Sequence, residues 1–454
     1  MISLEVTQTF GIGMLFSVSA LTVFSSLAVW EVLVAVSTVF ALFGLAGGVF
    51  NLPILGLLAS RLSGLLENDL LQAVPLYVFF GILLQYSGLA NDMLQLLKRL
   101  CYRLLLPQEL AVMLFSGLIS PMNGSVAASA GLLKRTLSDK AADHDSANGI
   151  SLISCAATVG LVIPPSLVLI LMGDAMMRAH TEAFNNGLSS ISNPHVMNTQ
   201  DMFHAALLPG LVLFILWAIV IAWKFRHLSE SPITTGAGAE TFSFLKAGFA
   251  IALIVLLLSG VFSGWLYAVE AAATGCLVLA VYVAWLMRHK LSVWQEIFRH
   301  TFSFSGSLLT LLMAATTFSL VFRLYETDQL INHWIVHSPP DTLHIAVIFV
   351  GVAVCAWMMD AFELIFVIIP IVSPGLILLM GDAQQVAVLL LLVIQMSFLL
   401  PPLGYAVVIA RQSASSVRTL DLLKALSPYL AALCLVFIWI LFNPGWVHWL
   451  DNPG

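Results

Sequence analysis

Two pairs of consecutive prolines interrupt long apolar stretches of this chain, and they mark where chemistry could occur. The pairs are Pro164 with Pro165 and Pro401 with Pro402. Proline lacks a backbone N–H and clashes with the preceding helical turn, so two in succession break a helix. In a lipid bilayer the freed carbonyl groups are costly unless protein or a water-filled cavity satisfies them. Unwound backbone of this kind can bind cations, and the helix N-termini beside it attract anions.

Small and polar residues gather around both predicted breaks. Small residues let the backbone approach a ligand closely; alternatively, small and hydroxyl residues here only pack helices together. The candidate contacts to an anionic substrate are Asn123, Ser125, Ser166, Asp360 and Arg411. The candidate ligands of a metal cation are Gly124, Thr158, Gly160, Gln395, Ser397 and Gly404.

Three ionisable residues in the second half of the chain could carry function. Asp360 and Glu363 lie one helical turn apart in an apolar setting, where charged groups are costly and usually functional. Alternatively, the pair faces an aqueous vestibule or is protonated and hydrogen-bonded between helices. Arg411 follows the break and could pair with a substrate carboxylate through its planar guanidinium. The competing interpretation of Arg411 is the cytoplasmic end of a helix.

The composition places the chain in a membrane. Of its 454 residues, 60% are apolar and 9% are charged, and the mean hydropathy is +0.99, whereas a soluble domain carries about 25% charged residues. Successive apolar stretches of about 17–25 residues predict an all-α polytopic protein and not a β-barrel. No phosphate-binding loop for ATP hydrolysis and no H-E-x-x-H motif occurs. The five cysteines lack metal-ligand spacing and are expected to pack among apolar residues.

The helical elements that position the candidate residues are two hairpins and two broken helices. The stretch Ala111–Arg135 is interrupted near Pro121, and because each half is too short to span about 30 Å of hydrocarbon, we expect a re-entrant hairpin. Residues 11–47 supply one or two spans, residues 51–70 an amphipathic connection, and Arg178–Asp201 a polar loop.

The predicted divisions of the chain into domains are 1–106 (scaffold spans with an amphipathic arm), 107–178 (transport domain, repeat 1), 179–342 (scaffold spans and linkers), 343–412 (transport domain, repeat 2) and 413–454 (C-terminal span).

The second half of the chain repeats the first at a fixed offset. Pro401 minus Pro164 is 237 residues, and Asp360 minus Asn123 is also 237. Matching breaks at one offset indicate an internal repeat. Sliding the chain by this offset aligns a second hairpin, with Asp360 at its tip, on the first.

Basic residues indicate that the two repeats are inverted. If the loop containing Lys98 and Arg103 is cytoplasmic, only Arg61, Arg178 and Arg323 of the 18 basic residues fall outside, which leaves 15 inside. This is a strong positive-inside pattern. The first hairpin then opens inward and the second outward, so the fold expected is an all-α membrane protein with two inverted-topology repeats. In this arrangement Arg323 is expected to cap a helix at the outer interface.

At these residues the chain resembles the large membrane subunit of tripartite ATP-independent periplasmic (TRAP) transporters. The resemblance rests on several motifs in family order, namely Ala73–Gly81, Gly160–Ser166, Tyr267–Ala273, Met359–Glu363 and Ser397–Gly404. It implies an elevator-type transporter with a scaffold and a transport domain, and coupling to Na⁺. It also implies two partners, a small four-helix membrane subunit and a periplasmic binding protein that delivers an organic anion.

Finer features of the resemblance bear on the substrate and the subunits. The run Ile163–Asp174 is similar to the branch labelled mannitol/chloroaromatic compound, some of whose members handle 2-oxo acids. Many family members have an Asp after the first hairpin tip, and Ser129 stands in its place here. The chain has too few extra spans to contain a fused small subunit, so that subunit is expected to be a separate chain.

The function expected is cation-coupled import, with Na⁺ as the ion, of a small organic anion such as a 2-oxo acid across a bacterial inner membrane. No enzymatic activity, no cofactor besides the coupling ion and no nucleic acid partner are expected. The alternative is an anion carrier or exporter of related inverted-repeat fold that needs no binding protein. Two other classes are an intramembrane hydrolase, with Ser305 as nucleophile and His333 as base, and a channel. No pattern brings Ser305 and His333 together, and paired inverted hairpins are an elaborate way to line a pore.

Overall fold

The computed structural model describes residues 4–25, 27–67, 69–123, 126–137, 146–164, 166–186, 197–226, 244–286, 291–337, 342–357, 359–411 and 417–450. Every regular element in these ranges is a helix. Seven helices are long and apolar enough to cross a membrane. The predicted class, an all-α polytopic membrane protein, is confirmed.

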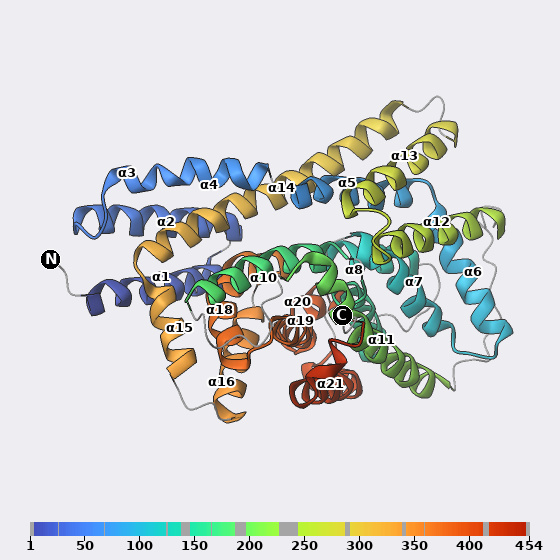
Figure 1. Cartoon of the computed structure of the whole chain (residues 1–454). Helices are drawn as coiled ribbons and strands as arrows, with labels where there is room; N and C mark the ends of the chain where they lie inside the picture. The colour runs from blue at the N-terminus through green and yellow to red at the C-terminus, as the bar shows by residue number, and fades with distance from the viewer. Residues whose placement is uncertain are drawn as a thin grey trace.

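One set of helices, which we call the outer layer, packs mainly on itself, except for its last member, which packs mainly on the central helices described below (Figure 1). Its bounds are α1 (Leu4–Phe24), α2 (Val29–Ala46), α3 (Leu52–Leu55), α4 (Leu57–Leu66), α5 (Asp69–Tyr86), α6 (Leu89–Arg103), α12 (Phe244–Phe262), α13 (Ala268–Leu286), α14 (Leu291–Leu324) and α15 (Thr327–His337). Residues 11–47 therefore form two helices, which resolves the alternative left open by the sequence. The amphipathic connection predicted over residues 51–70 corresponds to α3 and α4.

The remaining helices pack around the two breaks, and we call them the central group. Their bounds are α7 (Gln108–Asn123), α8 (Val126–Leu137), α9 (Ala147–Thr158), η1 (Val159–Leu161), α10 (Leu167–Asn186), α11 (Thr199–Lys224), α16 (Thr342–Ala356), α17 (Ala361–Glu363), η3 (Leu364–Ile368), α18 (Ile369–Met380), α19 (Ala383–Leu399), α20 (Tyr405–Arg411), α21 (Thr419–Phe442) and η4 (Pro444–Trp446). The two hairpins, α7–α8 and α16–α18, and the two broken helices, α9–α10 and α19–α20, lie where the prolines and the offset predicted them. The division into domains stays a prediction.

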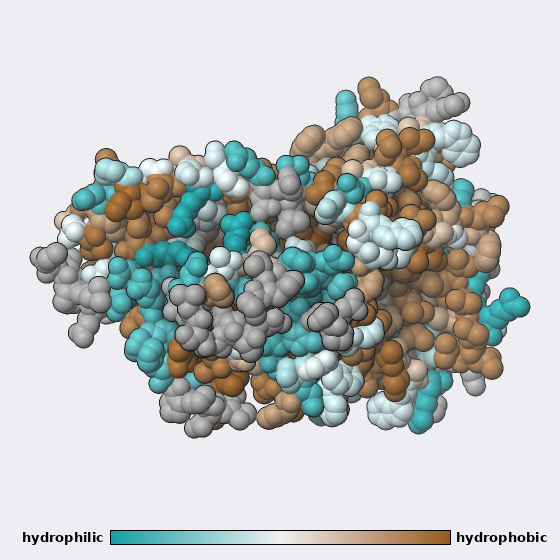
Figure 2. Space-filling view, in the orientation of Figure 1, coloured by the Kyte–Doolittle hydropathy of each residue, from teal (hydrophilic) through white to brown (hydrophobic). Residues whose placement is uncertain are grey.

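The central and outer helices differ in burial in the way their sequences require. In α19 the whole run from Gln385 to Gln395 is buried, as expected for a helix that is apolar on every side. In α12, by contrast, Leu245, Phe249 and Leu256 are exposed, as suits a face turned to lipid. Figure 2 shows hydrophobic side chains covering the right of one face, where α6, α11 and α12 lie in Figure 1.

One sequence prediction is wrong: the polar loop expected from Arg178 to Asp201 is shorter. Helix α10 continues through Arg178 to Asn186, and its middle turns carry an i,i+4 ion pair between Asp174 and Arg178 at 3.1 Å, which supports a helix. Helix α11 begins earlier than expected because Asn198 and Asp201 form a capping box at its start.

Close packing between α11 and the first break yields a test of the fold. A Cβ atom added to Gly210 would lie 2.7 Å from the carbonyl oxygen of Val162, whereas one added to Gly248 of α12 would meet nothing within 4 Å. We expect Gly210→Ala to lower the Tm of the purified protein, because overpacking costs about 1–3 kcal/mol. Gly248→Ala should leave the Tm unchanged or raise it, since alanine is the better helix former. Equal Tm values for both variants would contradict the packing.

Candidate functional site

The first break is closed by the first arm of the first hairpin. Ser116 of α7 donates a hydrogen bond to the carbonyl of Ala156 in α9, and its hydroxyl lies 2.7 Å from that of Ser120. Gly160 lies directly against Ser120, because a Cβ atom at Gly160 would be 2.6 Å from the Ser120 carbonyl carbon. Only glycine fits this position without displacing the backbone of α7.

The second break is closed in an equivalent way by the second hairpin. The indole of Trp357, at the end of α16, donates from Nε1 to the carbonyl of Leu400 at 2.7 Å. The N–H of Gly404 donates to the same carbonyl at 2.9 Å. A Cβ atom at Gly404 would lie 2.7 Å from this oxygen and 2.7 Å from that of Phe398. Gly404, a predicted cation ligand, thus packs against backbone carbonyls of its own break.

The two breaks meet each other at positions related by the repeat. Gln395 of α19 donates from Nε2 to the carbonyl of Thr158 at 3.2 Å, and 395 minus 158 is 237, the offset found in the sequence. Both residues are fully buried. The Gln395 Oε1 atom has no hydrogen-bond partner among the described residues. A buried carbonyl oxygen is therefore left over where the two halves of the chain touch.

The hydroxyl groups among the predicted cation ligands are used within their own helices. Thr158 donates to the carbonyl of Cys155 at 2.9 Å, and Ser397 donates to the carbonyl of Val393 at 2.9 Å. The structure thus brings Thr158, Gly160, Gln395 and Ser397 to the breaks, with Gln395 Oε1 as the atom that lacks a partner.

The acidic pair at the second hairpin tip has a structural role that we did not foresee. Asp360 accepts a hydrogen bond from the N–H of Ala361 at 2.7 Å, and Glu363 accepts one from the N–H of Asp360 at 3.0 Å. This is a capping box at the start of α17. The D-x-x-E spacing is that of a capping box, so this role was accessible from the sequence.

The other predicted substrate contacts are spread over both halves of the central group. Ser166 accepts a hydrogen bond from the N–H of Leu169 at 3.1 Å, in the first turn of α10. Arg411 donates to the carbonyl of Val417 at 2.7 Å, in keeping with the helix-end interpretation. Gly124, Ser125 and the side chain of Asn123 lie outside the described residues. Sequence reasoning missed Ser116, Ser120 and Trp357, which carried no signal apart from their position near a predicted hairpin tip.

Comparison with known protein families identifies the family to which the chain belongs. The model of the DctM component of tripartite ATP-independent periplasmic transporters matches residues 12–446. The chain belongs to this family. It is therefore a multi-pass inner-membrane subunit of a TRAP transporter and not an enzyme, which makes the hydrolase alternative wrong. The assignment to the mannitol/chloroaromatic branch stays a prediction.

Individual relatives agree with the family. The chain is 23% identical to the sialic acid TRAP transporter large permease protein SiaM of Vibrio cholerae, over 85% of this chain and 88% of that protein. It is 22% identical to the C4-dicarboxylate TRAP transporter large permease protein DctM of Pseudomonas aeruginosa, over 85% and 87%. Its fold is similar to the crystal structure of the YdaH transporter of Alcanivorax borkumensis, with a TM-score of 0.56, 14% identity, and coverage of 85% and 88%.

The closure of the second break by Trp357 can be tested in the large permease. Trp357→Phe keeps the ring but removes the N–H donor to Leu400, and a hydrogen bond of this kind contributes about 0.5–1.5 kcal/mol. We expect a lower Tm and slower substrate uptake. Trp223→Phe, at the exposed end of α11, is the matched control and should change neither. An equal loss of Tm in both variants would contradict the role of the indole.

Proposed function

We propose that this large permease forms a cation-coupled secondary transporter for a small organic anion, with Na⁺ as the coupling ion. A separate small membrane subunit and a periplasmic binding protein that delivers the anion complete the transporter. The relatives named for sialic acid and C4-dicarboxylates support a carboxylate as substrate. The predicted branch favours a 2-oxo acid.

The observation that carries the coupling proposal is the unpartnered oxygen of Gln395. Buried polar atoms almost always have a hydrogen-bond partner, and an exception indicates an ion, a water molecule or a catalytic role. Gln395 Oε1 points to such a ligand because its amide nitrogen is already held by the Thr158 carbonyl. The non-helical residues Val162–Pro164 closely follow Thr158 in sequence, and Leu400–Gly404 closely follow Gln395. Unwound carbonyls are the usual Na⁺ ligands in transporters with broken helices.

The substrate anion would be held by helix N-termini. Helix α10 begins at Leu167, directly after the first break, and a helix begins at Ala361 after the second hairpin tip. Such termini stabilise anions. Asp360 carries a like charge, so we propose that it supports the site by capping its helix and not by contacting the substrate carboxylate. Asn123, Ser125, Ser166 and Arg411 stay predictions as direct contacts.

Alternating access would follow from movement of the central group against the outer layer, which is the elevator mechanism that the resemblance implies. The contacts that close both breaks lie within the central group, from Ser116 and Ser120 to Trp357. The group can therefore move as one body without exposing the freed backbone of the breaks to lipid.

Coupling is tested with Gln395→Leu in proteoliposomes that contain both membrane subunits and receive the binding protein. Uptake of radiolabelled pyruvate, 2-oxoglutarate, succinate and sialic acid first identifies a transported anion. We then expect Gln395→Leu to raise the half-saturating Na⁺ concentration at least tenfold, which corresponds to about 1.4 kcal/mol, because an oxygen ligand is lost.

The matched control is Gln385→Leu on the same helix. Gln385 is buried and also donates its amide to carbonyls, those of Ile440 and Leu441, so this variant loses similar hydrogen bonds without touching the breaks. Its Na⁺ dependence should equal that of the unmodified protein. Uptake that continues undiminished without any cation gradient would remove the coupling proposal.

The role of Asp360 is tested by two substitutions with different capping ability. Asparagine caps a helix as well as aspartate does, whereas alanine costs about 0.5–2 kcal/mol. We expect Asp360→Asn to keep most of the uptake and Asp360→Ala to lose most of it. Asp421→Ala, at an exposed position in the first turn of α21, serves as control. Equal losses in Asp360→Asn and Asp360→Ala would show that the charge itself is needed.

A further inference from the structure

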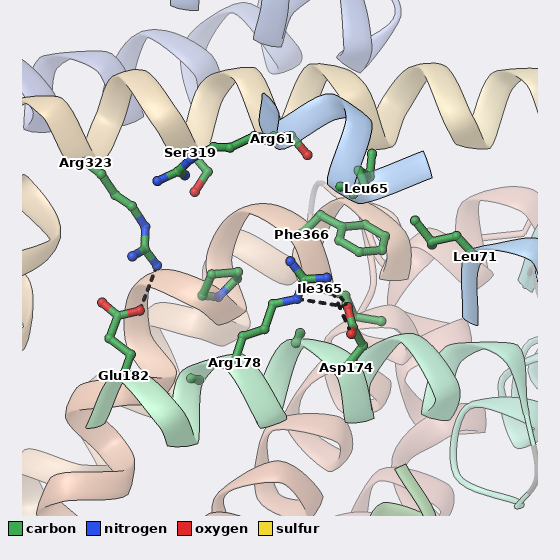
Figure 3. Close-up of a pocket in the computed structure, with 15 residues that line it drawn as sticks. Arg61, Leu65, Leu71, Asp174, Arg178, Glu182, Ser319, Arg323, Ile365 and Phe366 are labelled. Atoms are coloured by element: carbon green, nitrogen blue, oxygen red, sulfur yellow. Dashed lines mark hydrogen bonds and ion pairs between the residues drawn. The ribbon is translucent and has the colours of Figure 1, made fainter. Parts of the chain in front are cut away.

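A cavity of about 440 Å³ lies between the outer layer and the central group. Its walls come from α4 and α14 on one side and from α10, η3 and α18 on the other (Figure 3). The charged wall residues are Arg61, Asp174, Arg178, Glu182 and Arg323. Apolar residues such as Leu65, Ile365 and Phe366 form much of the rest.

The three arginines are the same three that the charge pattern placed on the outer side of the membrane. Arg61 comes from α4, Arg178 from α10 and Arg323 from α14, and among the residues that the structure describes no other basic side chain lines the cavity. Three arginines that are far apart in sequence thus line the same cavity. Their convergence is a property of the fold, because no local pattern links them.

Two of the arginines are paired and one is not. The Nη2 atom of Arg178 lies 3.1 Å from Oδ2 of Asp174. The Nη2 atom of Arg323 donates to Oε2 of Glu182 at 2.8 Å, and this ion pair joins α14 to α10. Arg323 therefore has a partner across the cavity, where the sequence led us to expect a helix cap. In the part of the chain that the structure describes, Arg61 has no hydrogen-bond or ion-pair partner.

The cavity carries a net positive charge. Among the wall residues, three arginines against two carboxylates leave one positive charge. Glu182, which pairs with Arg323, also interacts electrostatically with Arg61, so this one carboxylate serves two guanidinium groups. Asp328 interacts electrostatically with Arg323, but it is not a wall residue. A guanidinium offers five N–H donors in a planar fork that matches a carboxylate, so each paired arginine also keeps donors for a second acceptor. The hydroxyl of Ser319 adds a donor on the same wall, whereas that of Thr316 donates to the carbonyl of Leu312 at 2.9 Å.

We propose that this cavity binds a small carboxylate anion on the outer side of the transporter, with Arg61 as its principal contact and Arg178 and Arg323 beside it. The identification of the anion as transported substrate rests on the proposed function. Asp174 follows Ser166 by eight residues along α10, a rise of about 12 Å. An anion held in the cavity would thus lie near the first break before it enters the site there.

Charge-selective labelling tests the proposal without knowledge of the substrate. Ser319→Cys, in the protein with both membrane subunits, is treated with a negatively and a positively charged methanethiosulfonate of similar size. The protein without this substitution supplies the background from its native cysteines. We expect the anionic reagent to react at least tenfold faster than the cationic one, and pyruvate or succinate, whichever is transported, to slow the reaction.

Two further substitutions identify the group responsible. Arg61→Gln should reduce the ratio of the two labelling rates at least threefold and abolish protection by the carboxylate. Arg299→Gln is the control, because Arg299 is an exposed arginine at the opposite end of the same helix as Ser319, and it should change neither. Thr316→Cys, on the same wall, replaces Ser319→Cys if that variant does not fold.

Each result separates this proposal from the proposed function. Equal labelling rates for both reagents, no reaction with either, or an unchanged ratio in Arg61→Gln would overturn the cavity as an anion site. An anionic preference that depends on Arg61, found in a protein that transports none of the tested anions, would support the cavity and leave the proposed function contradicted.

Discussion

The structure depends on how the backbone groups freed at two helix breaks are satisfied inside an apolar environment. Each break is closed by its own hairpin, the first by Ser116 and Ser120 and the second by Trp357. The breaks then support each other through the bond from Gln395 to the Thr158 carbonyl. Because an unsatisfied backbone group in lipid costs several kcal/mol, these contacts must persist throughout any functional motion.

This constraint decides which parts of the molecule can move relative to each other. The hairpins and broken helices must stay together, whereas the boundary with the outer layer contains a cavity and few charged contacts, of which the pair Arg323–Glu182 joins the two sides. We therefore expect motion at that boundary. The cavity lies in the path of this motion, so an anion bound there would be affected by the position of the central group.

Much of the fold could be predicted because proline acts locally. Pro164 and Pro401 each stand where a helix ends, and their common offset revealed the repeat. The hydrogen bond from Gln395 to the Thr158 carbonyl joins two residues related by the same offset. The site could be predicted less well, because its decisive features depend on partners distant in sequence. Neither the free oxygen of Gln395 nor the ion pair of Arg323 with Glu182 follows from local pattern. The capping box of Asp360 is local, and its D-x-x-E spacing is visible in the sequence.

Reversible tethering of the central group to the outer layer tests the account most directly. Glu182→Cys in α10 and Arg323→Cys in α14 replace the ion pair that joins the two groups, and a short bifunctional thiol reagent with a cleavable link can connect them in proteoliposomes. The account predicts that anion uptake by the double variant stops when the link forms and returns to its level before linking when the link is cleaved. Each single-cysteine variant treated in the same way should keep the uptake that it shows without the reagent. Continued uptake by the linked protein would contradict movement of the central group as one body.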